Sequence, residues 1–420
     1  MRRGYSIAIT LLTLLACSSE KEPTTSTGQG GGGAGATQSG GSAGMGGNHS
    51  AGSSTASGAS AGGSSSGGAH SGGGSQPAGA GASNSAGSTS GPSGSGSPPA
   101  TGICGAAPGQ WFGSDYPFNQ RIDQAALDTE SRAIVEYLQA NHRDSRRFRI
   151  DGPSDEANNV YGLVLLGTDA GTIRQSFEAT DDFYDPDCDP APIPLPARGA
   201  IEGETSYACE EDGDCHLIVV DAEQCKLHEM WRANRSSPSS FSGGCQAIWD
   251  LRAAYTPTLR GDCCTSADAA GLPILAQTFT ADEIAAGRIA HAIRFILPNE
   301  HIRERIYVRP ATHATDTTGP ANAPPYGVRM RLKAGFDDSG LKPAARVVVR
   351  ALKEYGMILS DGGNLTFTAA NDRFTTHKWS EVDLMPGDLT SLNWSDFEVP
   401  ELGERYTWDD NCECRRTPIR

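Results

Sequence analysis

The sequence predicts a mainly β protein, an antiparallel β-sandwich with one or two decorating helices that is stapled by disulfides. Three observations predict this class. Most patterned segments after residue 100 are short and β-like, only two stretches have helical periodicity, and ten of the eleven cysteines follow residue 100. Many short strands with few helices are typical of β-sandwiches. The sequence has no repeat with a period of roughly 20–50 residues, which argues against a solenoid or a propeller.

The first 17 residues have the layout of a lipoprotein signal peptide. A basic start precedes an apolar run over 7–15, and the segment Leu-Leu-Ala-Cys ends at Cys17 with a small residue before the cysteine. The apolar run is too short for a permanent membrane helix. We therefore expect residues 1–17 to direct export and Cys17 to carry a lipid that anchors the protein to the cell envelope. Ser18 favours the outer membrane, with the folded domain periplasmic or extracellular.

Composition divides the rest of the chain into two parts. Residues 18–100 are dominated by Gly, Ser, Ala, Thr and Pro, which bury too little apolar surface to offset the entropy of ordering, so we expect a disordered tether. Residues 101–420 are long enough for a single globular β-rich domain. The formal net charge is −16, and the tether contributes almost none of it. An acidic domain repels phosphates, so we expect no nucleic-acid partner.

Helical periodicity marks two segments of this domain. Asp128 and Thr129 cap an amphipathic stretch that ends near Asn141, and Pro343 begins a second stretch that ends at Gly356. The other patterned segments are short, rich in β-branched residues and bounded by turn residues. We expect strands over 216–221, 225–231, 245–251, 289–297, 305–309, 327–334, 356–360 and 364–368.

The strand expected over 327–334 has two different faces. Apolar residues alternate with Arg329, Arg331 and Lys333, so one face belongs to the core and the other presents a row of cations. Such a row could neutralise an acidic substrate. The alternative is an ordinary solvated strand face.

The cysteine count indicates disulfide bonds. After Cys17 there are ten cysteines, an even number in an exported chain, as five disulfides would require. Zinc is the alternative, because Cys263-Cys264 and Cys412-Glu413-Cys414 are compact thiol clusters, although neither has the spacing of a zinc ribbon. The pair at the end of the chain indicates that the C-terminal tail is stapled back onto the domain.

The most informative local pattern is a predicted hairpin formed by 216–221 and 225–231. A two-residue turn at Ala222-Glu223, or a four-residue loop, sets His216 opposite Glu229. Directly opposed side chains lie about 4.5–5.5 Å apart at Cβ. A carboxylate beside an imidazole orients the ring and raises its pKa, as in a general base or a metal ligand. The alternative is an ion pair on the polar surface, but both residues share a face with apolar neighbours.

Five further residues are candidates for the same site. Asp250 ends a predicted strand and Asp268 lies in a tight turn, positions from which carboxylates supply acid and base roles; Asp268 could equally cap a turn. His291 and Arg294 lie on one predicted strand but point to opposite faces. His313 lies in a loop, where a histidine is either catalytic or simply solvated.

Other motifs are excluded or weak. His228-Glu229-Met230-Trp231-Arg232 has an arginine where a zinc protease has its second histidine, and the sequence has no phosphate-binding or dinucleotide-binding fingerprint in this domain. We therefore expect no catalytic metal and no organic cofactor. Asp185-x-Asp187-x-Asp189 lacks the glycine of a calcium loop. The acidic loop over 209–215 is a weak candidate for structural calcium.

Several long segments are specific enough to indicate a family. The clearest read Thr-Ser-Ala-Asp-Ala-Ala-Gly-Leu-Pro-Ile at 265–274, His-Ala-Ile-Arg at 291–294, Pro-Pro-Tyr-Gly at 324–327 and Tyr-Gly-Met at 355–357, with others at 117–123, 214–221, 247–251 and 395–399. Together they resemble a widespread family of secreted bacterial proteins of unassigned activity. The resemblance spans about 110–399 and implies one domain in an extracellular setting; it implies no reaction.

The function that the sequence favours is action on polysaccharide by a hydrolase with a carboxylate–histidine site. His216 and Glu229 would form the acid–base pair, with Asp250 or Asp268 as the second carboxylate. One alternative is a uronate lyase that uses Arg329, Arg331 and Lys333 for the substrate carboxylate, with Tyr307 or His291 as base. The other is a non-catalytic module that binds glycan or protein.

Overall fold

The computed structural model describes residues 96–141, 148–151, 162–180, 183–210, 213–409 and 411–420. The predicted signal peptide, Cys17 and most of the predicted tether lie outside these residues. The last part of the tether segment, 96–100, belongs to the described structure, because the backbone N–H of Gly167 donates to the Gly96 carbonyl at 3.2 Å. Within the described ranges, no helix has the length and apolar character that crossing a membrane requires.

The described chain is mainly β with few helices, as predicted, and each predicted strand overlaps an observed one. In chain order the elements are α1 (Ser131–Asn141), β1 (Leu163–Gly167), β2 (Ile173–Gln175), β3 (Glu178–Ala179), β4 (Ile193–Leu195), β5 (Leu217–Asp221), β6 (Lys226–Trp231), β7 (Asn234–Ser237), β8 (Ser240–Gly243), β9 (Cys245–Asp250), α2 (Ala281–Ala285), β10 (Ile293–Leu297), β11 (Ile306–Val308), β12 (Arg329–Leu332), α3 (Pro343–Glu354), β13 (Met357–Gly362), β14 (Thr366–Phe367), β15 (Ala370–Asn371), α4 (Trp379–Val382), β16 (Phe397–Glu398) and β17 (Arg405–Thr407).

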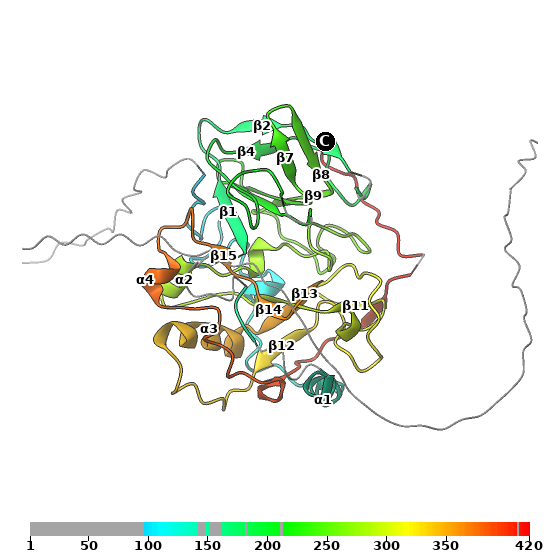
Figure 1. The fold of residues 1–420 in the computed structure, drawn as a ribbon. Helices are drawn as coiled ribbons and strands as arrows, with labels where there is room; N and C mark the ends of the chain where they lie inside the picture. Colours follow the sequence, from blue (N-terminus) through cyan, green and yellow to red (C-terminus); the bar gives the residue numbers. More distant parts are fainter. Residues whose placement is uncertain (1–95, 142–147, 152–161, 181–182, 211–212, 410) are drawn as a thin grey trace, which may run out of the picture. The chain divides into compact units, whose positions relative to one another are not determined.

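Two five-stranded sheets form the body of the domain. The first has the order β15-β1-β5-β6-β9, and the second has the order β14-β10-β13-β12-β16. In Figure 1, β1 and β9 mark the first sheet in the upper half, and β12, β13 and β14 mark the second sheet below it. Smaller sheets are formed by β2 with β4, by β11 with β17, and by β3, β8 and β7.

Both large sheets are mixed, so the expectation of a purely antiparallel sandwich is not met. In the first sheet β1 pairs in parallel with both β5 and β15, while β5, β6 and β9 are antiparallel. In the second sheet β10 and β13 are parallel. Parallel partners need long crossover connections, and the alternation of residues within one strand does not reveal them.

The main core lies between the two sheets. Ile218, Leu227 and Trp249 from the first sheet belong to the same buried cluster as Phe295 and Ile358 from the second. A second, smaller cluster covers the other face of the first sheet, where Leu217, Val219 and Met230 are buried. Because β5 is buried on both faces, its sequence is an apolar run instead of an alternation.

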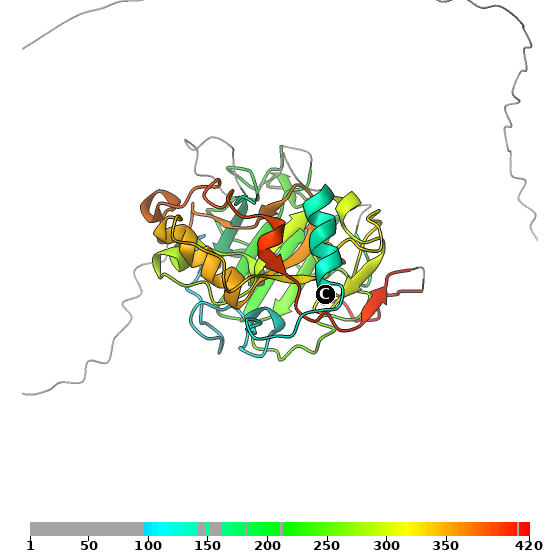
Figure 2. The same ribbon diagram turned by 90° about the horizontal axis from the view of Figure 1, so that it is seen from below.

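The two predicted helices are both present and cover the second sheet. Asp128 Oδ1 accepts from the N–H of Glu130 just before α1, and α3 has Pro343 in its first turn. Gly356 follows α3 with φ of +75°, the left-handed conformation that favours glycine after a helix. Seen from below in Figure 2, α1 (teal) and α3 (orange) lie in front of the strands.

All ten cysteines of the described domain form disulfides, which confirms that expectation and removes the zinc alternative, because zinc binds thiolates. The pairs are Cys104–Cys225, Cys188–Cys245, Cys209–Cys215, Cys263–Cys412 and Cys264–Cys414. The last two fasten the C-terminal tail to the loop that precedes α2, as the sequence predicts. Five disulfides indicate that the domain folds in an oxidising, extracytoplasmic compartment.

Candidate functional site

The predicted contact between His216 and Glu229 is wrong. The turn between β5 and β6 has four residues, with Cys225 at φ of +53°, and it pairs Asp221 with Lys226. Glu229 therefore lies opposite Ile218, two residues away from the predicted register. A shift of two residues keeps side chains on the same face, so the predicted burial of this face is correct while the pair is not.

The side chain of Glu229 completes hydrogen bonds inside the protein core. Its side chain is fully buried, with Oε2 accepting from Trp249 Nε1 at 2.9 Å and Oε1 accepting from the Leu275 backbone N–H at 2.8 Å. Burial raises the pKa of Glu229 to about 7 against the opposing effect of these donors. Both carboxyl oxygens are occupied within the core, which leaves none for a substrate.

His216 is instead held by two acceptors. Nδ1 lies 2.6 Å from Glu202 Oε2, and Nε2 lies 3.1 Å from the Ala267 carbonyl. A carbonyl only accepts, so Nε2 carries a proton, and a carboxylate at hydrogen-bond distance favours a proton on Nδ1 as well. Burial opposes the charge, but the charge and hydrogen bond of Glu202 raise the pKa of His216 to about 9. His216 is therefore a fixed imidazolium near pH 7, with no nitrogen free to act as a base.

Asp268 and Arg294, two of the predicted residues, meet in a buried cluster. Arg294 Nη2 donates to Asp268 Oδ1 and to Asp361 Oδ2, each at 2.8 Å, and Nη1 donates to Thr368 Oγ1 at 3.0 Å. Because both carboxyl oxygens contact the same nitrogen, they lie at most twice that distance apart. The cluster joins β10 and β13 to the loop before α2.

The two carboxyl groups of this cluster have different surroundings. The Asp268 side chain has no exposed surface, whereas 26% of the Asp361 side chain is exposed. No described group donates a hydrogen bond to Asp268 Oδ2, although the side chains of Asp268 and Asp361 interact directly. Burial raises the pKa of Asp268 well above its ordinary value, and the neighbouring Asp361 adds to the effect against the pull of Arg294. The protonated form of Asp268 is thus favoured beside a carboxylate that reaches solvent.

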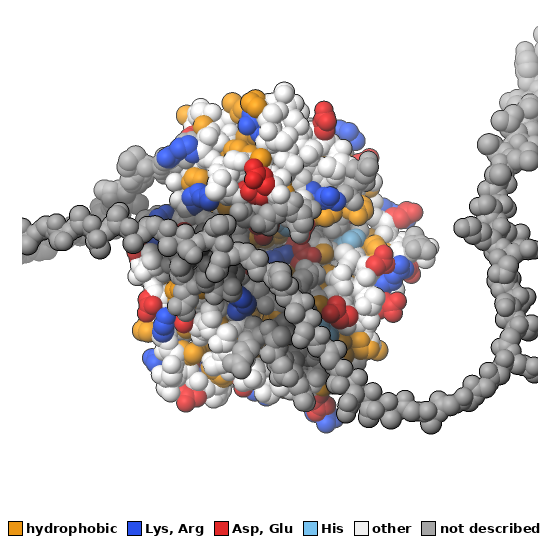
Figure 3. All heavy atoms as spheres, in the orientation of Figure 1, with side chains coloured by type: hydrophobic (Ala, Val, Ile, Leu, Met, Phe, Trp, Pro, Cys, Tyr) orange, Lys and Arg blue, Asp and Glu red, His pale blue; other side chains and the backbone are white. Residues whose placement is uncertain are grey.

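Two cavities adjoin the cluster. The smaller, about 240 Å³, is lined by His216, Glu202 and Arg294 among others, and the larger, about 460 Å³, is lined by Asp268, His313 and Tyr326 among others. Asp214, Asp361 and Gly362 line both, so the cavities meet at these residues. Figure 3 shows acidic, basic and histidine side chains in the belt between the upper and lower halves of the domain.

His313 belongs to this site. Its Nδ1 donates to the Ala269 carbonyl at 2.8 Å, which leaves Nε2 as an acceptor in the neutral ring. Burial lowers the pKa of His313 to about 4, so the ring stays neutral at pH 7. Trp408 packs against it with a ring separation of 5.1 Å.

Two other predicted residues lie elsewhere. His291 is buried, with Nε2 3.1 Å from Glu283 Oε1 and Nδ1 2.8 Å from the Ala292 carbonyl, so both nitrogens are engaged. Asp250 pairs with Lys226 at the turn end of the hairpin, whereas His216 precedes the other end of β5. Neither residue lines a cavity of the site.

The predicted row of cations, Arg329, Arg331 and Lys333, makes hydrogen bonds and ion pairs within the protein. Arg329 donates to the carbonyls of Tyr355, Pro117 and Gln120, and Lys333 donates to the Ser395 carbonyl. Arg331 pairs with Glu398 at 2.7 Å and lines a separate cavity of about 220 Å³. None of the three lines either cavity at the Asp361 cluster, so the role in substrate binding that the sequence indicates for them gains no support.

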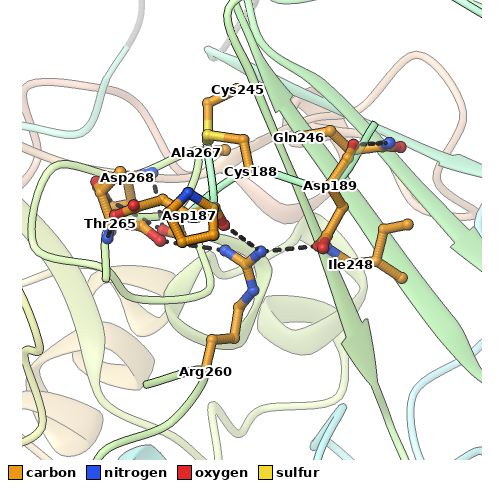
Figure 4. The surroundings of a disulfide bond; sticks show 12 residues. Asp187, Cys188, Asp189, Cys245, Gln246, Ile248, Arg260, Thr265, Ala267 and Asp268 are labelled. Carbon is orange, nitrogen blue, oxygen red and sulfur yellow. Dashed lines mark hydrogen bonds and ion pairs between the residues drawn. A yellow bond between two sulfur atoms is a disulfide. The ribbon is translucent and has the colours of Figure 1, made fainter. Parts of the chain in front are cut away.

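The acidic residues considered for calcium have other partners. Asp189 is fully buried between Arg260 and Arg416, each 2.7 Å away, and Asp187 Oδ2 accepts from the Thr265 N–H. Figure 4 shows Arg260 extended between Asp189 and the loop that leads to Asp268. Of the loop over 209–215, residues 211–212 lie outside the described residues. Within the described part of the chain, two groups of side chains are close enough to share an ion, and each includes cysteines that are disulfide-bonded.

Asp361, Asp214 and Glu202 are site residues that sequence reasoning missed. Asp361 comes directly after the strand predicted over 356–360, and the strand-end argument applied to Asp250 would also have selected it. Glu202 lies in a loop with no local signal. No protein-family model matches the chain, and searches among curated proteins and solved structures return no significant match.

Proposed function

We propose that this domain hydrolyses polysaccharide, with Asp361 and Asp214 as the reacting carboxyl groups. The supporting observation is that each of these residues lines both cavities, so they flank the junction that a chain of sugar rings would cross. Cavities of these sizes with a few convergent polar groups are typical of small-molecule subsites. Tyr184, which is 54% exposed, and Trp231 line the larger cavity and offer rings on which sugars stack.

Glycoside hydrolysis needs one carboxyl group that protonates the leaving oxygen and a second that activates water or stabilises the sugar cation. We assign the first role to Asp361, which would pass on the proton that Asp268 holds, because Asp268 interacts with it directly and is itself too buried to touch substrate. Asp214 takes the second role. His216 and Arg294 act as positioning residues that hold Glu202, Ala267 and Asp361 in place.

The proposal includes the cellular setting. The protein would be attached to the outer membrane through a lipid on Cys17 and a tether, which would hold the domain near extracellular or periplasmic glycans. Labelling cells with a fatty-acid analogue tests this part. Cys17→Ser is expected to abolish labelling and release the protein from membranes; labelled Cys17→Ser protein would contradict it.

The catalytic proposal is tested with the full chain on a panel of neutral, amino and acidic polysaccharides, with release of reducing ends as the readout. Asp361→Asn and Asp214→Asn are each expected to lower turnover at least about 100-fold. Asp383→Asn is the matched control, because Asp383 is 75% exposed and has φ of 51°, a conformation that Asn also adopts.

Two outcomes would overturn this proposal. Wild-type turnover in both folded variants would remove Asp361 and Asp214 from the reaction. Binding of a glycan without any release of reducing ends would favour the alternative, a non-catalytic glycan-binding module. Formation of an unsaturated, ultraviolet-absorbing product would identify a lyase instead.

A further inference from the structure

The segment that carries His313 is fixed to the neighbouring wall of the larger cavity. The backbone N–H of Thr312 donates to the Ala270 carbonyl at 3.0 Å, and Thr312 Oγ1 donates to the Cys264 carbonyl at 2.8 Å. Gly271 permits this close contact, because a Cβ atom there would lie 2.2 Å from Thr312 Oγ1. The backbone of His313 is therefore held in place where its side chain lines the cavity.

The imidazole ring of His313 is fixed as well. Its Nδ1 donates to the Ala269 carbonyl at 2.8 Å, and the Trp408 ring packs against it with a centroid separation of 5.1 Å. Trp408 is itself held by Arg305, whose carbonyl accepts from the Trp408 N–H at 2.8 Å and whose guanidinium lies 5.5 Å from the indole centroid. These contacts set the orientation of the ring, with Nδ1 toward Ala269 and Nε2 directed away from that carbonyl.

The Nε2 atom of His313 is an available hydrogen-bond acceptor. The Ala269 carbonyl only accepts, so the proton lies on Nδ1 and the neutral ring has a lone pair on Nε2. Burial lowers the pKa of His313 to about 4, so the ring stays neutral at pH 7. No described residue donates to Nε2, and the atom is not fully enclosed by the protein, so it is open to the cavity that the ring lines. Polar atoms inside proteins nearly always have a partner, so a ligand group that donates a hydrogen bond fits here.

Other side chains that line this cavity offer hydrogen bonds without charge. The hydroxyl groups of Tyr326 and Thr315 lie 3.4 Å apart, and Asn299 contributes a side-chain amide. None of the described residues in the lining is Lys or Arg, the side chains that bind carboxylate and sulfate groups. Sugar hydroxyls can donate, as Nε2 requires, and can accept from these neutral groups. The lining therefore favours a neutral sugar unit.

We infer that His313 Nε2 accepts a hydrogen bond from a hydroxyl group of the sugar unit in the larger cavity, which makes His313 a specificity-determining residue. The inference rests on the proposed function in that the ligand is a glycan, and it does not depend on the charge of any carboxylate. A ring with so low a pKa is a weak base, so its role is binding and not proton removal. Sugar units that carry an O-methyl, O-acetyl or sulfate group at this position have no proton to donate and should bind poorly.

The state of the ring is tested by NMR spectroscopy of the full chain with isotope-labelled histidine, with His313→Asn identifying the resonances. We expect Nε2 to have no proton at pH 7 and its resonance to shift when an oligosaccharide binds. A proton on Nε2 at pH 7 would overturn the inference, because the nitrogen could then only donate.

The contact itself is tested by calorimetry with neutral oligosaccharides of glucose, mannose and xylose. His313→Asn keeps a donor for the Ala269 carbonyl but has no atom in place of Nε2, so it should bind about tenfold more weakly than wild type. His313→Gln extends an acceptor toward the position of Nε2 and should restore part of the affinity. His377→Asn is the matched control, because 49% of the His377 side chain is exposed and His377 lines neither cavity.

Deoxy analogues of the oligosaccharide identify the hydroxyl group. Removing the hydroxyl that contacts Nε2 should weaken binding to wild type about tenfold and have no further effect in His313→Asn, whereas the effects at other positions should add. If the oligosaccharide is also hydrolysed, His313→Asn should raise KM and leave kcat nearly unchanged, the signature of binding shared by ground state and transition state.

Three outcomes would overturn the inference while leaving hydrolysis by Asp361 and Asp214 intact. These are equal affinity of His313→Asn and wild type, a fall in kcat at unchanged KM, and additive effects at every deoxy position. Conversely, binding that is weakened by His313→Asn without any turnover in wild type would support the inference and remove the proposed reaction. Absence of binding to neutral, amino and acidic oligosaccharides alike would reject both.

Discussion

Glu229 and Asp268 are both fully buried carboxyl groups with pKa values raised by burial, yet their hydrogen bonding differs. In the core, Glu229 has a donor on each oxygen, Trp249 Nε1 and the Leu275 N–H. One oxygen of Asp268 accepts from Arg294, and the other has no described donor; both lie beside Asp361 and a cavity. A raised pKa is therefore common to a structural carboxyl group and to one in a candidate site.

The difference shows which property separates the two roles. A buried carboxyl group with every oxygen occupied completes the hydrogen bonding of the fold, and its replacement should mainly affect stability. A buried carboxyl group with an oxygen that receives no hydrogen bond destabilises the fold somewhat, but next to a cavity it can take part in proton transfer. The predictions below test this contrast, beginning with the largest expected effect.

Glu229→Leu should destabilise the domain by about 3–5 kcal/mol. The substitution leaves two buried donors, Trp249 Nε1 and the Leu275 N–H, without acceptors, and each such loss costs about 1–3 kcal/mol in addition to the change in packing. Urea unfolding measures the loss. Glu229→Gln keeps the shape and one acceptor, so it should lose about 1–2 kcal/mol. If the leucine variant lost less than about 1 kcal/mol of unfolding free energy, Glu229 would not have the structural role that distinguishes it from Asp268.

His216 should contribute about 3 kcal/mol that depends on pH. Its pKa rises from 6.5 to about 9 on folding, so the folded state binds the extra proton, and the stabilisation is complete below pH 6.5. It is lost as pH rises through about 9. The difference in unfolding free energy between wild type and His216→Gln should therefore shrink between these values. A difference that stays constant with pH would mean that the His216–Glu202 pair is not ionic.

Asp268→Asn should change stability by less than about 1 kcal/mol. The amide resembles the protonated carboxyl group: its oxygen can accept from Arg294, and its NH2 group can donate to Asp361. Turnover should nevertheless fall, because the amide cannot share a proton with Asp361. Thermal unfolding and a glycan assay on the same preparation separate the two effects. Strong destabilisation would assign Asp268 to the same structural class as Glu229.

Asp250→Asn should have the smallest effect, less than about 0.5 kcal/mol. Its carboxylate pairs with Lys226 at 2.6 Å, but 41% of the side chain is exposed, and exposed ion pairs contribute little. The free energy of unfolding of both proteins, measured in low and in high salt, would give the contribution of this ion pair. Asn keeps an oxygen that can accept from the Arg252 N–H, so a loss above about 1 kcal/mol would show that the ion pair contributes more than its exposure predicts.

Local patterns in the sequence predict the elements whose causes are local. Pro343 and Gly356 mark the two ends of α3, because each acts within its own turn of the chain. Strands β5, β6 and β9 follow from apolar runs separated by turn residues. In contrast, β1 is not predicted. It lies between β5 and β15, two parallel partners from distant parts of the chain, and its own five residues have no alternation.

The candidate site is only partly predictable for the same reason. Asp268, Arg294, His216 and His313 stand out by residue type, and the structure brings them to the two adjoining cavities. Their partners are not recognisable beforehand. Glu202 comes from an irregular loop, and the four-residue turn after β5 comprises 222–225, one position farther along the chain than the four-residue loop that would set His216 opposite Glu229. A register set by one positive-φ residue, Cys225, decides which side chains meet.

The disulfide pattern also determines how the domain would respond to a mechanical pull. If tension acts on Cys104 and Cys412, the shortest covalent route crosses the first disulfide to Cys225, follows the 38 peptide units from there to Cys263, and crosses the second disulfide to Cys412. That segment spans at most about 125–140 Å when fully extended. The rest of the chain between Cys104 and Cys412 lies outside the route and bears no tension. A force applied between these two cysteines would therefore extend the domain only to the length of this segment, far less than the full chain between them, before covalent bonds resist it.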